Sequence, residues 1–335
     1  MFNRKQASAD KPQSPRPVWQ KLTAAVALGV LLLMTVLGWY WSRMPDVFWV
    51  NTKADGQAEV VGFATTDTLV RVAEVLLDKP GGYLSNDVMP PSVFLDNMPN
   101  WEFGVLQQVR DLSRTIRNDY SRSQSQSKED EDVAKADPEF NVDHQSWIMP
   151  RSETEYRSAI EGFTRYRDRL AGGRDAQFFA RADNLREWLS QVEKRLGSLS
   201  RRLGDSVMVS VINTDLAGDS AAESNSSLPD NVPVQTSWFK IDDIFFEARG
   251  TSWALVHFFR AAELDFHQVL ADKNAATSMR QIIRELEASL QPLRSPVILN
   301  GGGFGLTANH SLVMANYLAR ANAAVINLRE LLDQG

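Results

Sequence analysis

An uninterrupted apolar run near the N-terminus constrains this chain more than any other feature. Residues 22–41, LTAAVALGVLLLMTVLGWYW, are free of charge over about 20 positions, the length that a helix needs to cross a bilayer. Trp19 precedes the run, and Trp39, Tyr40 and Trp41 close it, as aromatic residues do at membrane interfaces. A buried core helix would show a polar face, and this run has none. We therefore predict a transmembrane helix over 22–41, with the lipid bilayer as its partner.

The charges around this run predict its orientation. Five basic residues and one acid precede it, whereas only Arg43 follows closely. The excess of Lys and Arg places the N-terminus in the cytoplasm, so that 1–21 form a cytoplasmic tail. A cleaved signal peptide is the alternative. The run is long for one, and no small-x-small cleavage site follows it, so we favour an uncleaved anchor.

The remainder of the chain is acidic and lacks cysteine. Once the residues before position 42 are removed from the totals of 36 basic and 42 acidic residues, 31 basic and 41 acidic residues remain. This excess of negative charge makes nucleic acid an implausible partner. The absence of cysteine excludes disulfides, thiolate metal sites and cysteine catalysis. We expect no cofactor.

Apolar residues recur at helical spacing from about residue 64 to the end. A stripe with the 3.5-residue period of coiled coils runs from Phe178 to Leu203. We expect an all-α fold, in which about seven helices form an elongated bundle over 64–335 with coiled-coil-like packing. One helix is expected over 237–271, with Gly250 as a possible bend, and the last helix is expected from about Ala308 to the C-terminus.

Three segments interrupt the helical pattern. The juxtamembrane segment 42–63 has Asp55-Gly56 between two apolar runs, which suggests a β-hairpin. Two polar stretches, near 121–150 and 204–236, are rich in Ser, Asp, Asn and Glu, and we expect them to be flexible inserts. Residues 80–100 hold several prolines and are expected to form a long ordered loop or lid.

A glycine-rich segment before the last helix is the best candidate for a binding site. GGGFGLTANH lacks the third glycine of a dinucleotide-binding loop and the lysine of a P-loop. Thr307 or Asn309 can cap the following helix, whose free N–H groups attract anions. Close packing of backbones is the alternative, which we favour because no Lys or Arg lies nearby. The candidate residues are Gly301, Gly302, Gly303, Gly305, Thr307, Asn309 and His310.

Other chemistry has weaker support. The four histidines show no H-E-x-x-H or H-x-H pattern, and the Glu-x-x-His spacing of di-iron bundles is missing, so no metal site is expected. There is no G-x-S-x-G motif. Paired acids at Asp242, Asp243 or Glu247 could act on glycosidic bonds, although acids on helices usually face water.

Several segments together resemble a known family. PGGYLSNDVMPPSVFLDNMPNWEFG at 80–104, the Ser-Arg-Ser-Gln-Ser run at 121–125 and GGGFGLTANHS at 301–311 resemble an uncharacterised family of proteobacterial inner-membrane proteins, the domain of unknown function 2333. The resemblance extends from about residue 20 to the end. It implies a Gram-negative inner membrane and a periplasmic bundle, but no activity, ligand or catalytic residue.

These observations lead to three hypotheses for function. The first is a non-enzymatic scaffold or interaction module of the cell envelope, with envelope proteins or a second copy of the chain as partners. The second is a periplasmic ligand-binding or sensory module, in which the loops at 80–100 and 300–310 form one cleft. The third, less favoured, is an enzyme that acts on peptidoglycan through Asp243 or Glu247. Whether 80–100 and 301–310 meet in space bears directly on the second.

Overall fold

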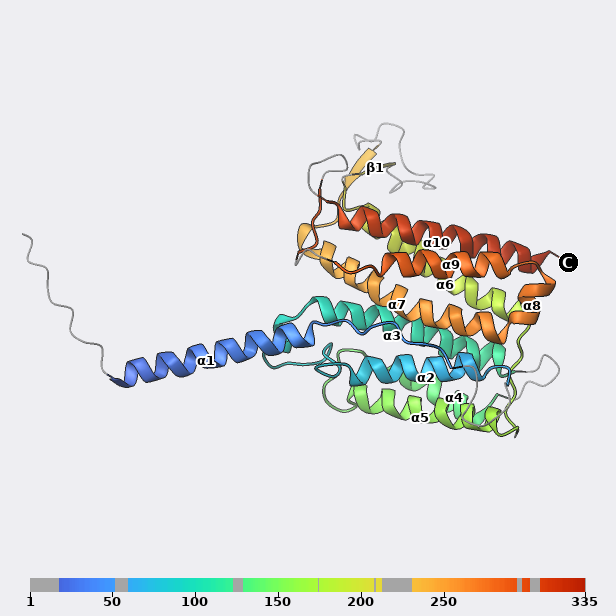
Figure 1. Cartoon of the computed structure of the whole chain (residues 1–335), viewed down its shortest axis with the longest axis horizontal. Coiled ribbons are helices and arrows are strands. Elements are labelled where there is room, and N and C mark those ends of the chain that lie inside the picture. The colour runs from blue at the N-terminus through green and yellow to red at the C-terminus, as the bar shows by residue number, and fades with distance from the viewer. Residues whose placement is uncertain are drawn as a thin grey trace, which may run out of the picture.

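The chain folds into one apolar N-terminal helix and a bundle of helices, as seen in a computed structural model (Figure 1). The structure describes residues 18–51, 60–122, 129–173, 175–207, 209–212, 231–293, 297–301 and 308–334. Its α-helices are α1 (Val18–Trp41), α2 (Phe63–Asp78), α3 (Asn97–Thr115), α4 (Glu131–Phe140), α5 (Ser152–Ala171), α6 (Ala182–Gly204), α7 (Ile241–Asp265), α8 (His267–Asp272), α9 (Ala276–Ser289) and α10 (His310–Asp333).

Shorter elements connect them. Ser92–Phe94 and Trp238–Lys240 are 3-10 turns, and Ile116–Tyr120 is a π-helical turn that extends α3. β1 (Val209–Ile212) and β2 (Asn231–Val234) form a two-stranded antiparallel ribbon, in which Val209 pairs with Val234. The prediction of an all-α fold with an N-terminal apolar helix is confirmed.

The bundle has three layers (Figure 1). α3 and α7 form the central pair; α6, α9 and α10 lie on one side of it, and α2, α4 and α5 on the other. The apolar stripe predicted for α6 is buried through Leu189, Val192, Leu196 and Leu203, and α6 packs against α10. Such burial is consistent with coiled-coil-like packing. Phe178 precedes α6 and instead packs against Tyr120 and Phe266.

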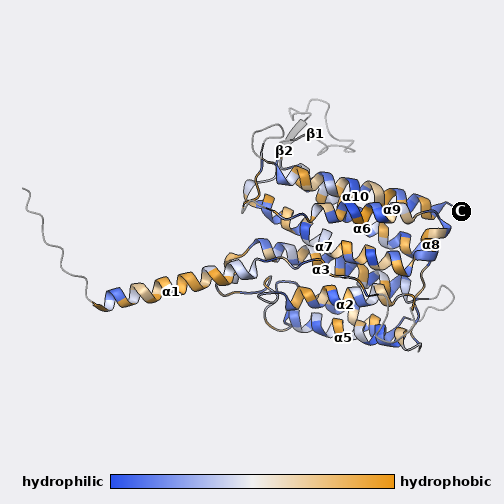
Figure 2. Ribbon diagram, viewed as in Figure 1, coloured by the Kyte–Doolittle hydropathy of each residue, from blue (hydrophilic) through white to orange (hydrophobic). Residues whose placement is uncertain are grey.

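Helix α1 differs from the other helices in being apolar around its whole circumference. It projects from the bundle, and almost all of its residues are exposed (Figure 2). By length and composition it can cross a membrane, a property it shares with N-terminal signal sequences. Only its last turn meets the bundle, where Gly38 lies against Pro91 and Leu95.

A strap of extended chain, residues 42–51, fastens α1 to the bundle. The Phe48 N–H donates to His257 Nε2 at 3.0 Å, and the Phe48 ring stacks on the His257 ring at 3.9 Å. Arg71 Nη1 donates to the Trp49 carbonyl, and Trp253 Nε1 donates to that of Asp46. Burial lowers the pKa of His257 to about 3, so this ring is a neutral acceptor at pH 7.

Two expectations for the connecting segments differ from the structure. The strap 42–51 takes the place expected for the first strand of a hairpin, because its backbone bonds to α7 and α2; residues 52–59, with Asp55-Gly56, lie outside the described residues. Part of the supposed insert at 121–150 is helix α4, which packs against α5 and buries Val133, Ala136 and Phe140. These three apolar residues stand among acidic residues, so the composition of the segment did not predict a buried helix. The insert at 204–236 lies largely outside the described residues.

The central pair packs through two glycines. A Cβ added at Gly104 would collide with the carbonyl oxygen of Glu247, and one added at Gly250 would collide with that of Trp101. Gly250 therefore allows α3 and α7 to approach closely. Helix α7 continues through Gly250 without interruption, so the prediction of a bend there is wrong. The expected helix over 237–271 is divided instead at Phe266, between α7 and α8.

We expect Gly250→Ala to lower the free energy of unfolding by at least about 2 kcal/mol, because neither backbone can move away without disturbing the layers on both sides. Urea denaturation of the full chain in a mild detergent measures this change. The matched control is Gly204→Ala in α6, where a Cβ meets nothing within 4 Å. Its expected effect lies between zero and a gain of about 1 kcal/mol. Equal effects of the two substitutions would refute the close-contact explanation.

Candidate functional site

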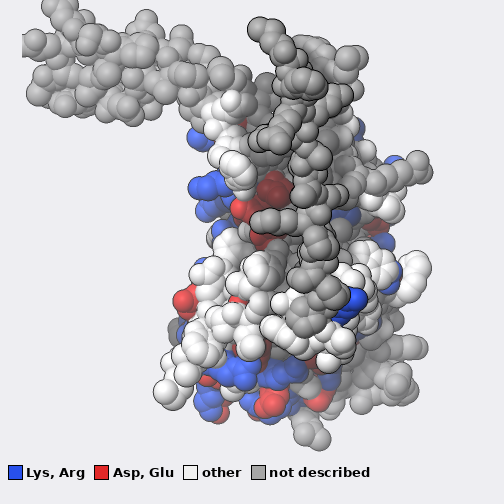
Figure 3. Space-filling model, turned by 90° about the vertical axis from the view of Figure 1, so that its left-hand side faces the viewer, with Lys and Arg blue, Asp and Glu red and all other residues white. Residues whose placement is uncertain are grey.

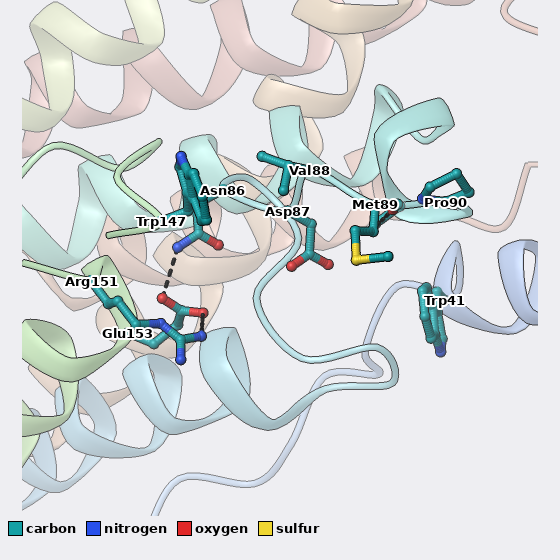
Figure 4. A pocket seen from close by; sticks show the side chains of 10 residues that line it. Trp41, Asn86, Asp87, Val88, Met89, Pro90, Trp147, Arg151 and Glu153 are labelled. Carbon is teal, nitrogen blue, oxygen red and sulfur yellow. Dashed lines mark hydrogen bonds and ion pairs between the residues drawn. The ribbon is translucent and has the colours of Figure 1, made fainter. Parts of the chain in front are cut away.

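A cleft lies where α1 meets the bundle (Figure 4). We call it the anchor cleft; it encloses about 500 Å³. Trp41 at the end of α1 forms one wall, the loop from Asn86 to Pro90 forms the floor, and Trp147, Arg151 and Glu153 form the opposite wall. A volume of this size falls in the range of small-molecule sites.

A buried ion pair holds the floor of this cleft. Lys79, which follows α2, pairs with Glu102 of α3, and both side chains are fully buried. Glu102 also accepts hydrogen bonds from the backbone N–H groups of Leu84 and Ser85, each at 2.8 Å, and from the Ser85 hydroxyl. Burial raises the pKa of Glu102, against the Lys79 charge and these donors, which lower it.

The two walls of the cleft are tied to this floor. The Asn86 side-chain amide donates to Glu153 at 2.7 Å and to the Ser146 carbonyl at 2.9 Å. Arg151 pairs with the other oxygen of Glu153 at 3.2 Å (Figure 4). On the anchor side, Gly81 has φ +90°, and an added Cβ would lie 2.7 Å from Trp41. Only glycine adopts this conformation readily and leaves room for the indole.

A second hollow, the side groove, lies between α3, α6 and α7 and encloses about 320 Å³. Gln107, Gln191 and Lys194 line it. Gln108 also lines it, although this residue is buried, and its Nε2 has no hydrogen-bond partner among the described residues. A buried donor without a partner is costly, so a ligand carbonyl or carboxylate that reached this amide after a shift of the groove wall would be stabilised.

The acids considered for catalysis are engaged in structural contacts. Both Nη atoms of Arg202 donate to Glu247, at 2.9 and 2.8 Å, in a bidentate pair at the edge of the side groove. Asp243 accepts from the Asn100 amide at 2.7 Å, which joins the beginnings of α3 and α7. Burial raises the pKa of Asp243. No group of three or more His, Asp or Glu residues that could hold a metal occurs in the part of the chain that the structure describes.

Of the predicted glycine-loop site, three residues are described. Gly301 is buried, and its carbonyl accepts from the Asn309 amide at 2.6 Å. Asn309 caps α10, as predicted for it or Thr307, because its side chain accepts from the Leu312 N–H at 2.9 Å. His310 begins α10, and its Nδ1 accepts from the Leu299 N–H at 3.1 Å. Gly302, Gly303, Gly305 and Thr307 lie outside the described residues, so an anion site there stays a prediction.

The two loops expected to share one cleft take part in different contacts. The anchor cleft is lined by residues of 86–92, 147–153 and Trp41, and none of its described lining residues comes from 297–310. Of the other loop, Asn300 instead donates to the Ser206 carbonyl, and His310 faces Phe245. No sequence motif pointed to Trp147, Arg151 or Glu153 as part of a site. The run Trp147-Ile148-Met149 in a polar stretch was the available signal.

We expect Lys79→Met to lower the free energy of unfolding by about 3–5 kcal/mol, because the buried carboxyl of Glu102 would lose the cation that pairs with it. Amide hydrogen exchange should also quicken at Leu84 and Ser85, whose N–H groups bond to Glu102. The control is Arg157→Met, which breaks the half-exposed Arg157–Asp78 pair and should cost at most about 1 kcal/mol. Unchanged exchange at residues 84 and 85 would mean that the loop does not depend on this pair.

Comparison with known proteins gives a family but no activity. A family described as an uncharacterized protein conserved in bacteria, the domain of unknown function 2333, matches residues 14–335. The chain belongs to this family, as its resemblance at 80–104 and 301–311 predicts. No curated protein and no solved structure matches the chain.

Proposed function

We propose that this chain is a single-pass protein of the bacterial inner membrane and a non-enzymatic interaction module of the cell envelope. In this proposal, 1–21 are a cytoplasmic tail, 22–41 cross the bilayer, 42–63 are the juxtamembrane segment and 64–335 form the periplasmic domain. The helical domain serves as a scaffold for envelope proteins or for a second copy of the chain. The polar stretch near 204–236 remains a proposed flexible insert.

The observation that carries this proposal is the junction of α1 with the bundle. α1 leaves its apolar surface exposed over nearly its whole length, yet its last turn packs on the bundle through Gly38 and Trp41. The strap then continues this contact along α7 through Phe48 and His257. This packing suits an anchor that is retained, because a signal sequence that is cleaved does not need to pack against the folded domain.

The use of charged side chains favours binding over catalysis. Acids that lie near hollows, such as Glu247 and Glu153, are neutralised by arginines, and Asp243 fixes a helix end. A catalytic acid needs an environment that shifts its pKa and leaves it free to meet a substrate. Paired acids of this kind stabilise the bundle instead.

Topology is tested by labelling single cysteines, which is straightforward because the chain has none of its own. We expect a membrane-impermeant maleimide to label Asp272→Cys, an exposed position on α8, in intact spheroplasts. Ser8→Cys should react only after permeabilisation. The mass of the mature protein should include the N-terminal helix. A protein that begins after residue 41, or the reverse labelling pattern, would overturn the proposed topology.

A second function, ligand binding, is favoured by the side groove. The unpaired Nε2 of buried Gln108 and the charge of Lys194 suit a small molecule that carries a carboxylate or an amide. This groove replaces the cleft between 80–100 and 300–310 as the basis of the ligand-binding hypothesis.

If this second function holds, a panel of amino acids and short peptides should contain a member that raises the thermal midpoint of the purified full chain, because ligand binding stabilises the folded state by mass action. Gln108→Leu should abolish that rise. The control Gln145→Leu, at an exposed position that does not line the groove, should keep it. If no member shifts the midpoint, or if Gln108→Leu responds like the control, ligand binding in this groove is refuted and the scaffold proposal is unaffected.

A further inference from the structure

Exposed apolar side chains gather at the end of the bundle from which α1 emerges. They come from the loop before α3, the loop before α5 and the turn before α7. We call this surface the foot; it consists of Val88, Met89, Val93, Phe94, Trp147, Ile148, Met149, Trp238 and Phe239. Viewed from the side of α1, uncharged residues cover much of the lower half of the described surface, with an acidic group above them and a band of charged residues below (Figure 3).

The exposure of the foot is high for residues of this kind. Phe94 is 77% exposed, Met149 is 89% exposed and Phe239 is 87% exposed. Single exposed apolar residues are ordinary, but a contiguous group marks an interaction surface. Asn100 of α3 and Asp243 of α7 are hydrogen-bonded, which keeps the turn with Phe239 near the loop with Phe94.

The contact with α1 fixes how far the foot lies from the membrane. A helix crosses the bilayer core of about 30 Å in about 20 residues, so a span counted from Leu22 ends near Trp41. Gly38 then lies about 5 Å inside the far edge of the core, at a rise of about 1.5 Å per residue. Because Gly38 contacts Pro91 and Leu95, the loop that carries Phe94 lies at the membrane interface.

We propose that the foot docks on the lipid surface and inserts its apolar side chains into the interfacial layer of the leaflet from which α1 emerges. This inference rests on the proposed function, in that α1 must span the bilayer. Lipid is the occupant that the geometry favours, because exposed Trp39 and Tyr40 follow Gly38 directly in α1, and Gly38 lies against Pro91 in the loop at 88–94, so these exposed apolar side chains share one depth. The bilayer that surrounds α1 covers both without any further partner.

Charged residues limit how deep the foot can go. Asp87 and Asp96 flank the apolar loop and are both exposed, so their carboxylates must stay among headgroups or in water. Arg43 lies over the Trp39 ring at 4.2 Å, as a cation does that reaches from the end of a membrane helix toward the headgroups. The foot therefore enters the interface, about 5–10 Å deep as amphipathic surfaces do, and does not reach the centre of the bilayer.

The full chain, reconstituted in nanodiscs of phosphatidylethanolamine and phosphatidylglycerol, tests this proposal. Single-cysteine variants Leu31→Cys, Phe94→Cys, Met149→Cys and Asp272→Cys carry a spin label. Power saturation with oxygen and with a water-soluble nickel chelate then gives the depth of each label. We expect the label at position 31 in the hydrocarbon core, those at 94 and 149 within about 5–10 Å of the phosphate level, and that at 272 in water.

The labelling results distinguish lipid docking of the foot from the proposed topology of α1. A label in the core at position 31, with the labels at 94 and 149 fully open to the nickel chelate, would overturn lipid docking and leave the anchor intact. A water-exposed label at position 31 would overturn the proposed topology. Labels at 94 and 149 shielded from both oxygen and nickel would mean that a second copy of the chain covers the foot, which also overturns lipid docking. The agreement of positions 94 and 149, on separate loops, guards against local distortion by one label.

Discussion

The carboxylate of Glu102 determines the shape of the end of the bundle that carries α1. It is buried, and it is satisfied by the Lys79 ammonium together with three donors from Leu84 and Ser85. A buried charge is tolerated only when its hydrogen bonds are met in full, so the chain from 79 to 85 has one acceptable path. That path places Gly81 under Trp41 and starts the loop that forms the floor of the anchor cleft. The seat of Trp41 and the floor of the cleft both depend on this one charge.

The remainder of the bundle supports this end by close packing. Gly104 and Gly250 allow the backbones of α3 and α7 to come into contact. The other helices cover this pair on two sides. Arg249 of α7 donates to the carbonyls of Ser289, Leu290 and Gln291, where α9 ends. Burial lowers the pKa of Arg249 to about 10, well above neutral pH, so the cation persists at this helix end. The layers are thus joined by polar contacts to backbone as well as by apolar packing.

Periodicity in the sequence was enough to predict the apolar helix, the all-α fold and the stripe of α6, because each depends on residues close in the chain. It could not predict α4, whose three core residues stand among acids, or the strap, whose hydrogen bonds join Phe48 to His257 over a separation of 209 residues. The anchor cleft could not be predicted for a similar reason. Asn309 acts as the cap that its residue type predicts, but the cleft is built from the loops at 86–92 and 147–153, which only the path of the chain brings together.

The strap fixes the orientation of the foot relative to α1. A flexible linker after a membrane helix would let a domain turn freely, and exposed apolar loops would then face water for much of the time. Here Trp41 is seated on Gly81, and Phe48 is bonded to and stacked on His257, so α1 and the bundle share one orientation. In the proposed topology, any tilt of α1 moves the foot toward or away from the lipid. Burial of Phe94 and Met149 at the interface would favour one tilt.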